Sequence, residues 1–524
     1  MGPVLHGIKK GGSSVNRISV LSYLDETYLK YPDKTAFFSE AGNMTFLQLY
    51  QYSRSAGSYL ADAGYYRKPI VVFMRKSSEM IAAFLGVVRG GCYYVPIDEE
   101  MPEHRIALIF ETLRPELVIC DGTTARAAQE LQSSAAAPFR IVNSTELRGY
   151  PVNEPALAAV EERTIDTDSI YIVFTSGSTG IPKGVVACHR SVIDYIENLS
   201  EILQISDDTV FGNQAPLYVD ACLKEIYPTL KYGASTYLIP KQLFMFPVKL
   251  VEYLNEHQIN TICWVVPALT LISSLGTFKT VVPEALRTVA FGSEVFPVKQ
   301  FNLWKRQLPK TRFINLYGPT EATGMSCYYE ATREFGPEEA IPIGRPFRNT
   351  EILLLDEENK PAAPGQAGEI CIRGTSLTLG YYRDFARTDA AFVQNPLNDS
   401  YHELIYRTGD LGRYNERGEL MFLSRKDYQI KHMGHRIELG EIEMLANRSA
   451  GVECSCCIFD KERSKIILYY VGAAEEPALL AELKSRLPRY MLPGAIRRIS
   501  AVPLTANGKI DRLALMALYQ QEGN

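Results

Sequence analysis

The sequence lacks the features that would place the protein in a membrane, outside the cell or on a nucleic acid. No stretch approaches the ~20 consecutive apolar residues of a membrane span. Residues 1–10 contain no apolar core of a signal peptide. The net charge of −5 gives no electrostatic reason to expect nucleic acid. We therefore expect a cytoplasmic protein with no membrane partner and no nucleic-acid partner.

Paired metal-binding motifs are missing as well. Three of the ten cysteines, Cys454, Cys456 and Cys457, lie close together, but they lack CxxC spacing and have no nearby histidine. Free thiols in a reducing compartment are the expected state. His432 and His435 have no further Cys or His nearby, so a surface loop is a better interpretation than a metal site.

What remains is the composition of an ordinary soluble globular protein. Its 524 residues are 46% hydrophobic and 22% charged, enough for two or more domains with a large core. A helix is predicted over 44–60, and strands over 69–74, 92–98 and 117–120 alternate with helices over 81–88 and from Pro102. Residues 122–168 are interpreted as surface helix and linker. This alternation predicts an α/β fold.

The stretch 175–184 is the most informative segment. The apolar run 170–174 leads into Thr-Ser-Gly-Ser-Thr-Gly-Ile-Pro-Lys-Gly, and 185–187 follows as a return strand. Glycines let successive backbone N–H groups turn inward around an anion, hydroxyls add donors, and Lys183 adds a positive charge. A plain turn is the alternative. A Walker A loop does not fit, because Pro182 precedes the lysine and Gly184 follows it.

Further motifs arrive in order downstream. Residues 313–323 form an apolar strand that delivers Asn, Tyr, Thr and Glu at a Gly-Pro turn. Residues 288–294, 368–374, 406–412 and 424–443 supply other strand-and-turn segments, and 503–512 contain an Asn-Gly turn before Lys509.

Taken together, these segments resemble the adenylate-forming superfamily, in particular free-standing amino-acid adenylation domains of nonribosomal peptide synthesis and D-alanine–carrier-protein ligases. The resemblance covers roughly residues 20–515. It implies an α/β fold with a large N-terminal domain (1–426) of layered α/β subdomains and a distorted β-barrel. A small mobile α+β C-terminal domain (427–524) follows, with Asp427 as its hinge.

The resemblance also implies a nucleotide site for ATP and Mg²⁺. Thr320 would contact the α-phosphate, Glu321 would ligate Mg²⁺, Asp410 would hold the ribose hydroxyls, and Lys509 would bridge substrate and nucleotide. A solvated lysine on a turn is the alternative for Lys509. The remaining nucleotide-binding residues implied are Thr175, Ser176, Gly177, Ser178, Thr179, Gly180, Lys183, Gly292, Ser293, Asn315, Tyr317, Gly318, Arg425 and Lys431.

Asp220 is the residue that distinguishes amino acids from other acids. The resemblance implies that the Asp220 carboxylate holds the α-ammonium of the substrate. The alternative is that Asp220 caps a helix. The segment departs from the usual Phe-Asp by having Val219. A buried Lys224 would need a partner, which is either a substrate carboxylate or carbonyl, or Asp220 or Glu225. The residues implied to line the side-chain pocket are Ala221, Lys224, Trp264, Val289, Phe291, Leu316, Gly324 and Met325.

The reaction implied is ATP-dependent formation of an aminoacyl-AMP with release of pyrophosphate. The aminoacyl group then passes to the phosphopantetheine thiol of a carrier protein. The sequence contains no Gly-Gly-x-Ser of a carrier domain and no His-His-x-x-x-Asp-Gly of a condensation domain, so the carrier is expected to act in trans. Two alternatives stay open: an acyl- or aryl-CoA ligase, and a nonenzymatic nucleotide-binding relative.

Overall fold

A six-stranded sheet forms the first layer of the molecule, in the order β6-β5-β3-β4-β7-β8. The computed structural model describes residues 17–134, 137–177, 181–426, 429–504 and 510–522. All neighbours in this sheet pair in parallel except β7 and β8, which are antiparallel and bracket the predicted phosphate loop. Its strands are β3 (Pro69–Phe73), β4 (Tyr93–Ile97), β5 (Leu117–Cys120), β6 (Arg140–Asn143), β7 (Ser169–Thr175) and β8 (Lys183–Cys188).

The helices around this sheet confirm the predicted alternation. They are α3 (Ser78–Arg89), α4 (Glu103–Leu113), α5 (Ala125–Ser134), α6 (Ser144–Arg148) and α7 (Glu154–Arg163). The interpretation of 122–168 as helix and linker was wrong in one respect, because β6 within it adds a strand to the sheet edge. Only Val142 of that strand is buried, so its sequence carries little apolar signal.

A nine-stranded sheet forms the second layer, in the order β15-β14-β13-β12-β11-β9-β10-β1-β2. Its strands are β1 (Thr35–Phe38), β2 (Met44–Thr45), β9 (Val210–Asn213), β10 (Ser235–Leu238), β11 (Thr261–Val265), β12 (Thr288–Gly292), β13 (Arg312–Tyr317), β14 (Cys327–Glu330) and β15 (Arg345–Pro346). Its helices are α1 (Leu21–Thr27), α2 (Phe46–Asp62), α8 (His189–Leu203), α9 (Leu223–Tyr232), α10 (Pro247–Glu256), α11 (Val266–Ser274) and α12 (Val298–Gln307).

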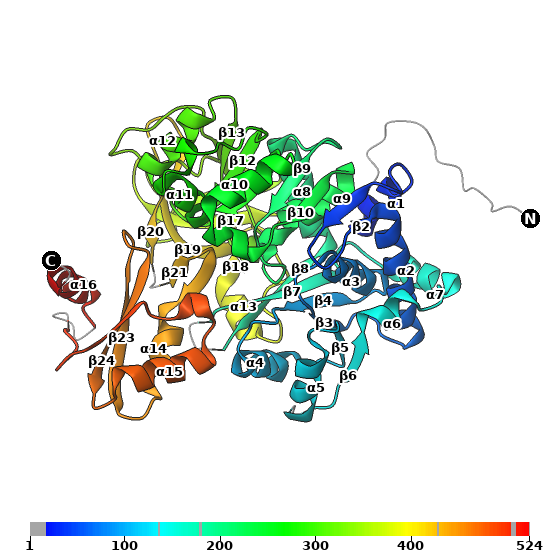
Figure 1. The fold of residues 1–524 in the computed structure, drawn as a ribbon. Coiled ribbons are helices and arrows are strands. Elements are labelled where there is room, and N and C mark those ends of the chain that lie inside the picture. The colour runs from blue at the N-terminus through cyan, green and yellow to red at the C-terminus, as the bar shows by residue number, and fades with distance from the viewer. Residues whose placement is uncertain (1–16, 135–136, 178–180, 427–428, 505–509, 523–524) are drawn as a thin grey trace, which may run out of the picture.

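One apolar cluster joins the two layers. It takes residues from α2, α3, α8 and α9 together with one face of β3, β7 and β13, such as Ile70, Ile170 and Ile314. Figure 1 shows α8 and α9 beside the strands of both sheets. The opposite face of the nine-stranded sheet packs on α10, α11 and α12 in a separate cluster. The other face of the six-stranded sheet packs on α4 and α5 in a third cluster. Both sheets therefore have apolar clusters on both faces, which is the usual state of parallel strands.

The chain ends in two smaller units. A five-stranded antiparallel sheet lies where the resemblance implied a distorted barrel: β16 (Thr350–Leu355), β17 (Gly368–Gly374), β18 (Phe392–Gln394), β19 (Leu404–Tyr414) and β20 (Leu420–Arg425), with α13 (Phe385–Ala391). The C-terminal part contains the hairpin β21 (Gln429–His432) and β22 (His435–Glu438), then α14 (Leu439–Asn447), β23 (Val452–Asp460), β24 (Lys465–Gly472), α15 (Glu476–Arg486), β25 (Ala495–Arg498) and α16 (Arg512–Glu522).

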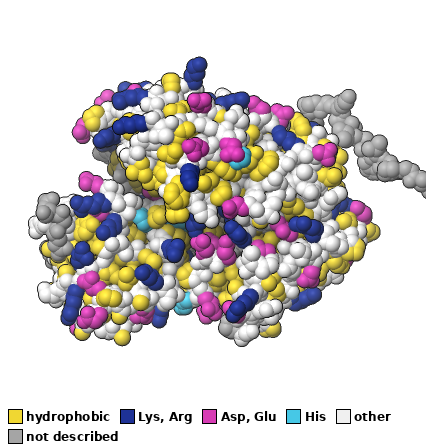
Figure 2. All heavy atoms as spheres, in the orientation of Figure 1, with side chains coloured by type: hydrophobic (Ala, Val, Ile, Leu, Met, Phe, Trp, Pro, Cys, Tyr) yellow, Lys and Arg dark blue, Asp and Glu magenta, His cyan; other side chains and the backbone are white. Residues whose placement is uncertain are grey.

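The C-terminal part packs against the large N-terminal part. Arg105 of α4 and Glu441 of α14 form an ion pair whose side chains are only 5% and 2% exposed. In Figure 1 the orange C-terminal elements lie beside α4 and below the green elements. Figure 2 shows Lys/Arg and Asp/Glu side chains interspersed over the same face. No helix of the described residues has the length and apolar character needed to cross a membrane.

Candidate active site

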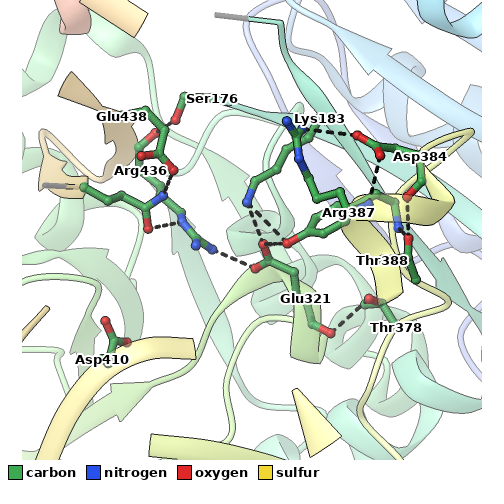
Figure 3. Close-up of polar contacts among 12 residues, drawn as sticks. Ser176, Lys183, Glu321, Thr378, Asp384, Arg387, Thr388, Asp410, Arg436 and Glu438 are labelled. Carbon is green, nitrogen blue, oxygen red and sulfur yellow. Dashed lines mark hydrogen bonds and ion pairs between the residues drawn. The ribbon is translucent and has the colours of Figure 1, made fainter. Parts of the chain in front are cut away.

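Glu321 is the centre of a buried polar network. It lies in a short 3-10 turn, Thr320–Ala322, directly after β13, and its side chain is fully buried. One carboxylate oxygen accepts from Lys183 Nζ at 3.0 Å and from the Tyr381 hydroxyl at 2.7 Å. Arg436 donates to the other oxygen at 2.7 Å. Figure 3 shows the side chains of Lys183 and Arg436 pointing toward Glu321.

The charges of this network determine its protonation. Burial alone would raise the pKa of Glu321, but Arg436 and Lys183 hold that pKa well below its ordinary value. Burial lowers the pKa of Lys183, and Glu321 opposes that shift. These neighbours therefore favour the anionic form of Glu321, which is the form that ligates magnesium. Arg436 lies in the 424–443 segment, but the sequence reasoning assigned no role to it or to Tyr381.

The phosphate-loop residues lie next to this network. Ser176 Oγ donates to the backbone carbonyl of Arg436 at 2.6 Å, so the loop contacts the C-terminal hairpin directly. The backbone N–H of Gly177 opposes the rise in the pKa of Glu441 that burial causes. The Thr175 hydroxyl is buried and makes no hydrogen bond to a residue that the structure describes. Ser178, Thr179 and Gly180 lie outside the described residues.

The residues expected to bind the nucleoside form a second group. Asp410 of β19 accepts from the Tyr317 hydroxyl at 2.5 Å through one oxygen, and Arg425 of β20 donates to the other. Asn315 donates to the carbonyl of Pro342 at 2.8 Å. Lys431 lies over the Tyr317 ring, 5.9 Å from its centroid. The structure thus brings together four of the predicted residues: Tyr317, Asp410, Arg425 and Lys431.

Glycines at the strand ends permit the close approach of neighbouring segments. A Cβ on Gly292 would lie 2.2 Å from the carbonyl oxygen of Leu316, and one on Gly318 would lie 2.5 Å from the Met325 Cα. Any other residue would push these segments apart. Ser293 follows with a positive φ of 69°.

The hairpin β21–β22 lies against this site from the C-terminal side. Gly434 donates its N–H to Glu294 at 2.9 Å, and a Cβ at Gly434, where φ is +80°, would lie 2.5 Å from Val265. Burial raises the pKa of Glu294 to about 7. The surface-loop interpretation of the histidines was wrong: His432 is buried in β21, and the His435 ring stacks 3.6 Å from that of Tyr490. Asp427 and Lys509 lie outside the described residues.

Asp220 lies at the start of a short 3-10 turn that leads into α9. Neither the turn nor the helix has a side-chain cap, so the helix-cap alternative is not supported. Its carboxylate instead lies near the Thr320 side chain, which lowers the pKa of Asp220 and is the neighbour of Glu321. Burial raises the pKa of Asp220, while Lys224 lowers it. The carboxylate predicted to bind the substrate ammonium thus lies next to Thr320, which is predicted to contact the α-phosphate.

The predicted side-chain pocket is only partly assembled around Asp220. Leu316 and Met325 lie in the same apolar cluster as α8 and α9, with Ala221 packed against it. Gly324 lies against Tyr195, since a Cβ there would be 3.3 Å from the Tyr195 hydroxyl oxygen.

Three other predicted pocket residues lie elsewhere. Trp264, Val289 and Phe291 belong to the cluster on the opposite face of the sheet, under α10–α12. Successive side chains of a strand alternate between faces. The face of β11 and β12 toward Asp220 therefore carries Cys263 and Ala290. Sequence spacing alone did not reveal this, because all of these residues are apolar.

Comparison with known proteins identifies the family. The family described as AMP-binding enzyme matches residues 24–382. The chain belongs to the AMP-binding enzyme family. It is 32% identical over 513 residues to the D-alanine–D-alanyl carrier protein ligase of Bacillus licheniformis, across 94% of this chain and 98% of that protein. It is also 31% identical to bacitracin synthase 1 of the same species, but spans only 9% of that protein's length.

A solved structure has the same fold. The holo form of PA1221, a nonribosomal peptide synthetase protein with adenylation and PCP domains, matches with a TM-score of 0.81 and 27% identity. The match covers 95% of this chain and 84% of the other. The family description agrees with the predicted adenine-nucleotide ligand. Among the described residues, no group of three or more His, Cys, Asp and Glu forms a metal cluster.

Proposed function

We propose that this AMP-binding enzyme activates an amino acid with ATP, forms the aminoacyl-AMP and releases pyrophosphate. It then transfers the aminoacyl group to the phosphopantetheine thiol of a carrier protein in trans. The observation that carries the proposal is the contact between Asp220 and Thr320. This contact places the carboxylate proposed to bind the substrate ammonium beside the predicted phosphate site. The similarity to a D-alanine–D-alanyl carrier protein ligase supports the choice of substrate and partner.

In the first step the substrate carboxylate attacks the α-phosphate of ATP, and pyrophosphate leaves. The protein positions the reactants and neutralises charge, since the attacking carboxylate is already ionised. Thr320 orients the α-phosphate, Lys183 and the hydroxyls of the 175–180 loop hold the leaving pyrophosphate, and Lys509 bridges attacker and nucleotide. Mg²⁺ would neutralise phosphate charge, and Glu321 would hold it, because one carboxylate plus phosphate oxygens satisfies this ion.

The arrangement in the structure fits the second step better than the first. With Arg436 on one oxygen of Glu321 and Lys183 and Tyr381 on the other, the carboxylate is fully engaged. Glu321 would be free to hold Mg²⁺ once Arg436 withdraws, which requires movement of the β21–β22 hairpin. We assign residues 1–426 and 427–524 to two domains that rotate about Asp427, so that Lys509 and the hairpin alternate at the site.

Two other functions are less well supported. An acyl- or aryl-CoA ligase has no use for a carboxylate at Asp220, because its substrate has no ammonium to pair with it. The o-succinylbenzoate CoA synthetase MenE of Bacillus subtilis matches at 19% identity, which is evidence of the fold alone. A nonenzymatic nucleotide-binding protein has no use for Lys509.

The test is amino-acid-dependent exchange of labelled pyrophosphate into ATP. The screen would cover the proteinogenic amino acids, D-alanine, β-amino acids and aryl acids. We expect exchange with at least one amino acid, abolished in Lys509→Ala and retained in the control Lys310→Ala, which changes an exposed lysine. Exchange only with acids that lack an amine would contradict the proposal. An unchanged rate in Lys509→Ala would contradict the mechanism.

A further inference from the structure

Arg387 is a cation beside the phosphate loop to which the proposed mechanism gives no role. The residue lies in α13, and a Cβ on Gly177 of the loop would lie 3.7 Å from Arg387 Nη1. The same Cβ would clash with the carbonyl oxygen of Ile181, so the loop folds back on itself at Gly177. The Arg387 side chain is 27% exposed, so a ligand in the loop can reach it.

The segment that leads into α13 is fixed to the strand that carries Lys183. Val186 of β8 donates its N–H to the carbonyl of Gly380 at 3.0 Å, and Tyr382 donates its N–H to the carbonyl of Gly184 at 2.8 Å. These hydrogen bonds extend the six-stranded sheet beyond its edge strand β8. Backbone pairing therefore sets the position of α13 relative to the phosphate loop.

Two side chains orient the start of α13. Asp384 accepts the backbone N–H of Arg387 at 3.1 Å, and its other carboxylate oxygen lies 3.5 Å from Arg387 Nη1. The Thr388 hydroxyl accepts the N–H of Tyr381 at 2.9 Å and donates to the carbonyl of Asp384 at 2.8 Å. Figure 3 shows these contacts together with Lys183 and Glu321. The guanidinium is thus held in place before any ligand binds, which lowers the entropy lost on binding.

The charge of a triphosphate calls for a cation in addition to Lys183. Lys183 donates to Glu321 at 3.0 Å and to the Tyr381 hydroxyl at 3.3 Å, so part of its charge is already neutralised. A triphosphate carries more negative charge than one such lysine offsets. A guanidinium has several N–H donors in a planar fork that matches phosphate oxygens, enough to bind phosphate and keep the contact with Asp384.

We propose that Arg387 binds the β- and γ-phosphates of ATP, which leave as pyrophosphate. This inference rests on the proposed function and adds a residue that binds its leaving group. The loop that Arg387 borders is the one proposed to hold pyrophosphate, whereas Asp410 and Tyr317 belong to the group expected to bind the nucleoside. Arg387 should therefore matter for ATP and pyrophosphate and not for AMP.

The experiment measures the affinity for ATP and for AMP by calorimetry in the wild type and in three variants. Arg387→Met should weaken ATP binding about 10-fold or more, through loss of charge-assisted hydrogen bonds, and leave AMP binding unchanged. Arg387→Lys should recover part of the affinity, because it keeps the charge without the fork. Arg383→Met removes the same charge from an exposed position of the same segment and should bind both nucleotides as the wild type does.

Pyrophosphate exchange supplies a second readout. In Arg387→Met the KM for pyrophosphate should rise by a similar factor, while the KM for the amino acid stays the same. Carrier loading from preformed aminoacyl-AMP should also stay the same, because pyrophosphate has no part in that step. A fall confined to carrier loading would assign Arg387 to the phosphate of phosphopantetheine and overturn the inference.

The remaining outcomes separate this inference from the proposed function. Equal weakening of ATP and AMP binding in Arg387→Met would indicate a merely structural role and overturn the inference. Unchanged ATP binding and an unchanged KM for pyrophosphate would overturn it as well, with amino-acid adenylation left standing. A wild type that binds ATP through Arg387 but exchanges pyrophosphate with no amino acid would overturn the proposed function and leave the phosphate contact standing.

Discussion

Arg436 Nη1 lies 2.7 Å from one carboxylate oxygen of Glu321, on the opposite side from Lys183. A residue of the C-terminal hairpin thus neutralises the carboxylate predicted to hold Mg²⁺ (Figure 3). Contact with Arg436 and binding of Mg²⁺ would exclude each other at this carboxylate. Several measurable consequences arise from this competition and from the contacts around it.

Arg436→Met should separate the two half-reactions. Removing the guanidinium frees one oxygen of Glu321, so adenylation should need less Mg²⁺. Transfer to the carrier protein should fall about 10-fold or more, because the docked hairpin loses a buried charged contact worth roughly 1.5–3 kcal/mol. Exchange across a Mg²⁺ titration and a carrier-loading assay measure the two effects.

The control for this variant is Arg448→Met, which removes an exposed arginine at the end of α14. It should change neither assay. If Arg436→Met left loading intact and raised the Mg²⁺ requirement, Arg436 would not compete for Glu321.

Asp410→Asn should weaken nucleotide binding. The two oxygens of Asp410 now accept from Tyr317 and Arg425, and we expect them to accept from the ribose hydroxyls when ATP is bound. Losing a charged acceptor corresponds to an increase of about 10- to 100-fold in KM for ATP. Asp399→Asn, at an exposed position, is the matched control. An unchanged KM would exclude Asp410 from the nucleotide site.

The Arg105–Glu441 ion pair should stabilise the docked arrangement of the C-terminal part. Removing one partner of a buried pair costs about 3–5 kcal/mol, because it leaves the other charge unpaired. Rotation of the C-terminal part away from α4 would expose the unpaired charge of Glu441 to water. Arg105→Met should therefore favour the undocked arrangement and slow carrier loading more than pyrophosphate exchange. Energy transfer between dyes on the two parts reports the shift, and Arg105→Met with Glu441→Leu should reverse much of it. No shift in either variant would contradict the role of this pair.

His435 should make stability depend on pH in the acid range. Burial, with a further contribution from Arg105, lowers the pKa of His435 to about 4. The unfolded chain binds a proton near pH 6.5, so this residue has no effect well above pH 6.5 and costs stability as pH falls toward 4. Between pH 7 and 5 the loss is about 2 kcal/mol. Denaturant unfolding of His435→Phe should show a shallower decline than wild type, whereas exposed His104→Phe should not. Equal slopes would contradict the assignment.

Much of this arrangement could be predicted from the sequence, because the motifs combine local backbone signals with unusual polar residues. The strands that flank the phosphate loop and the 313–323 turn were predicted from apolar runs, glycines and their order. The partners of Arg436 and Arg105 could not be predicted, since each lies more than a hundred residues away and only tertiary packing brings it near. Which residues of β11 and β12 face Asp220 could not be predicted either, because Trp264 and Cys263 are adjacent and both apolar.

The central claim is that Asp220 selects an amino acid by pairing with its α-ammonium group. The most direct measurement compares pyrophosphate exchange with the preferred amino acid and with the same acid lacking the amine, in wild type and in Asp220→Ala. The account predicts strong wild-type preference for the amine-bearing acid and loss of that preference in the variant, with little change in KM for ATP. Equal use of the two acids by the wild type, or an unchanged preference in Asp220→Ala, would contradict it.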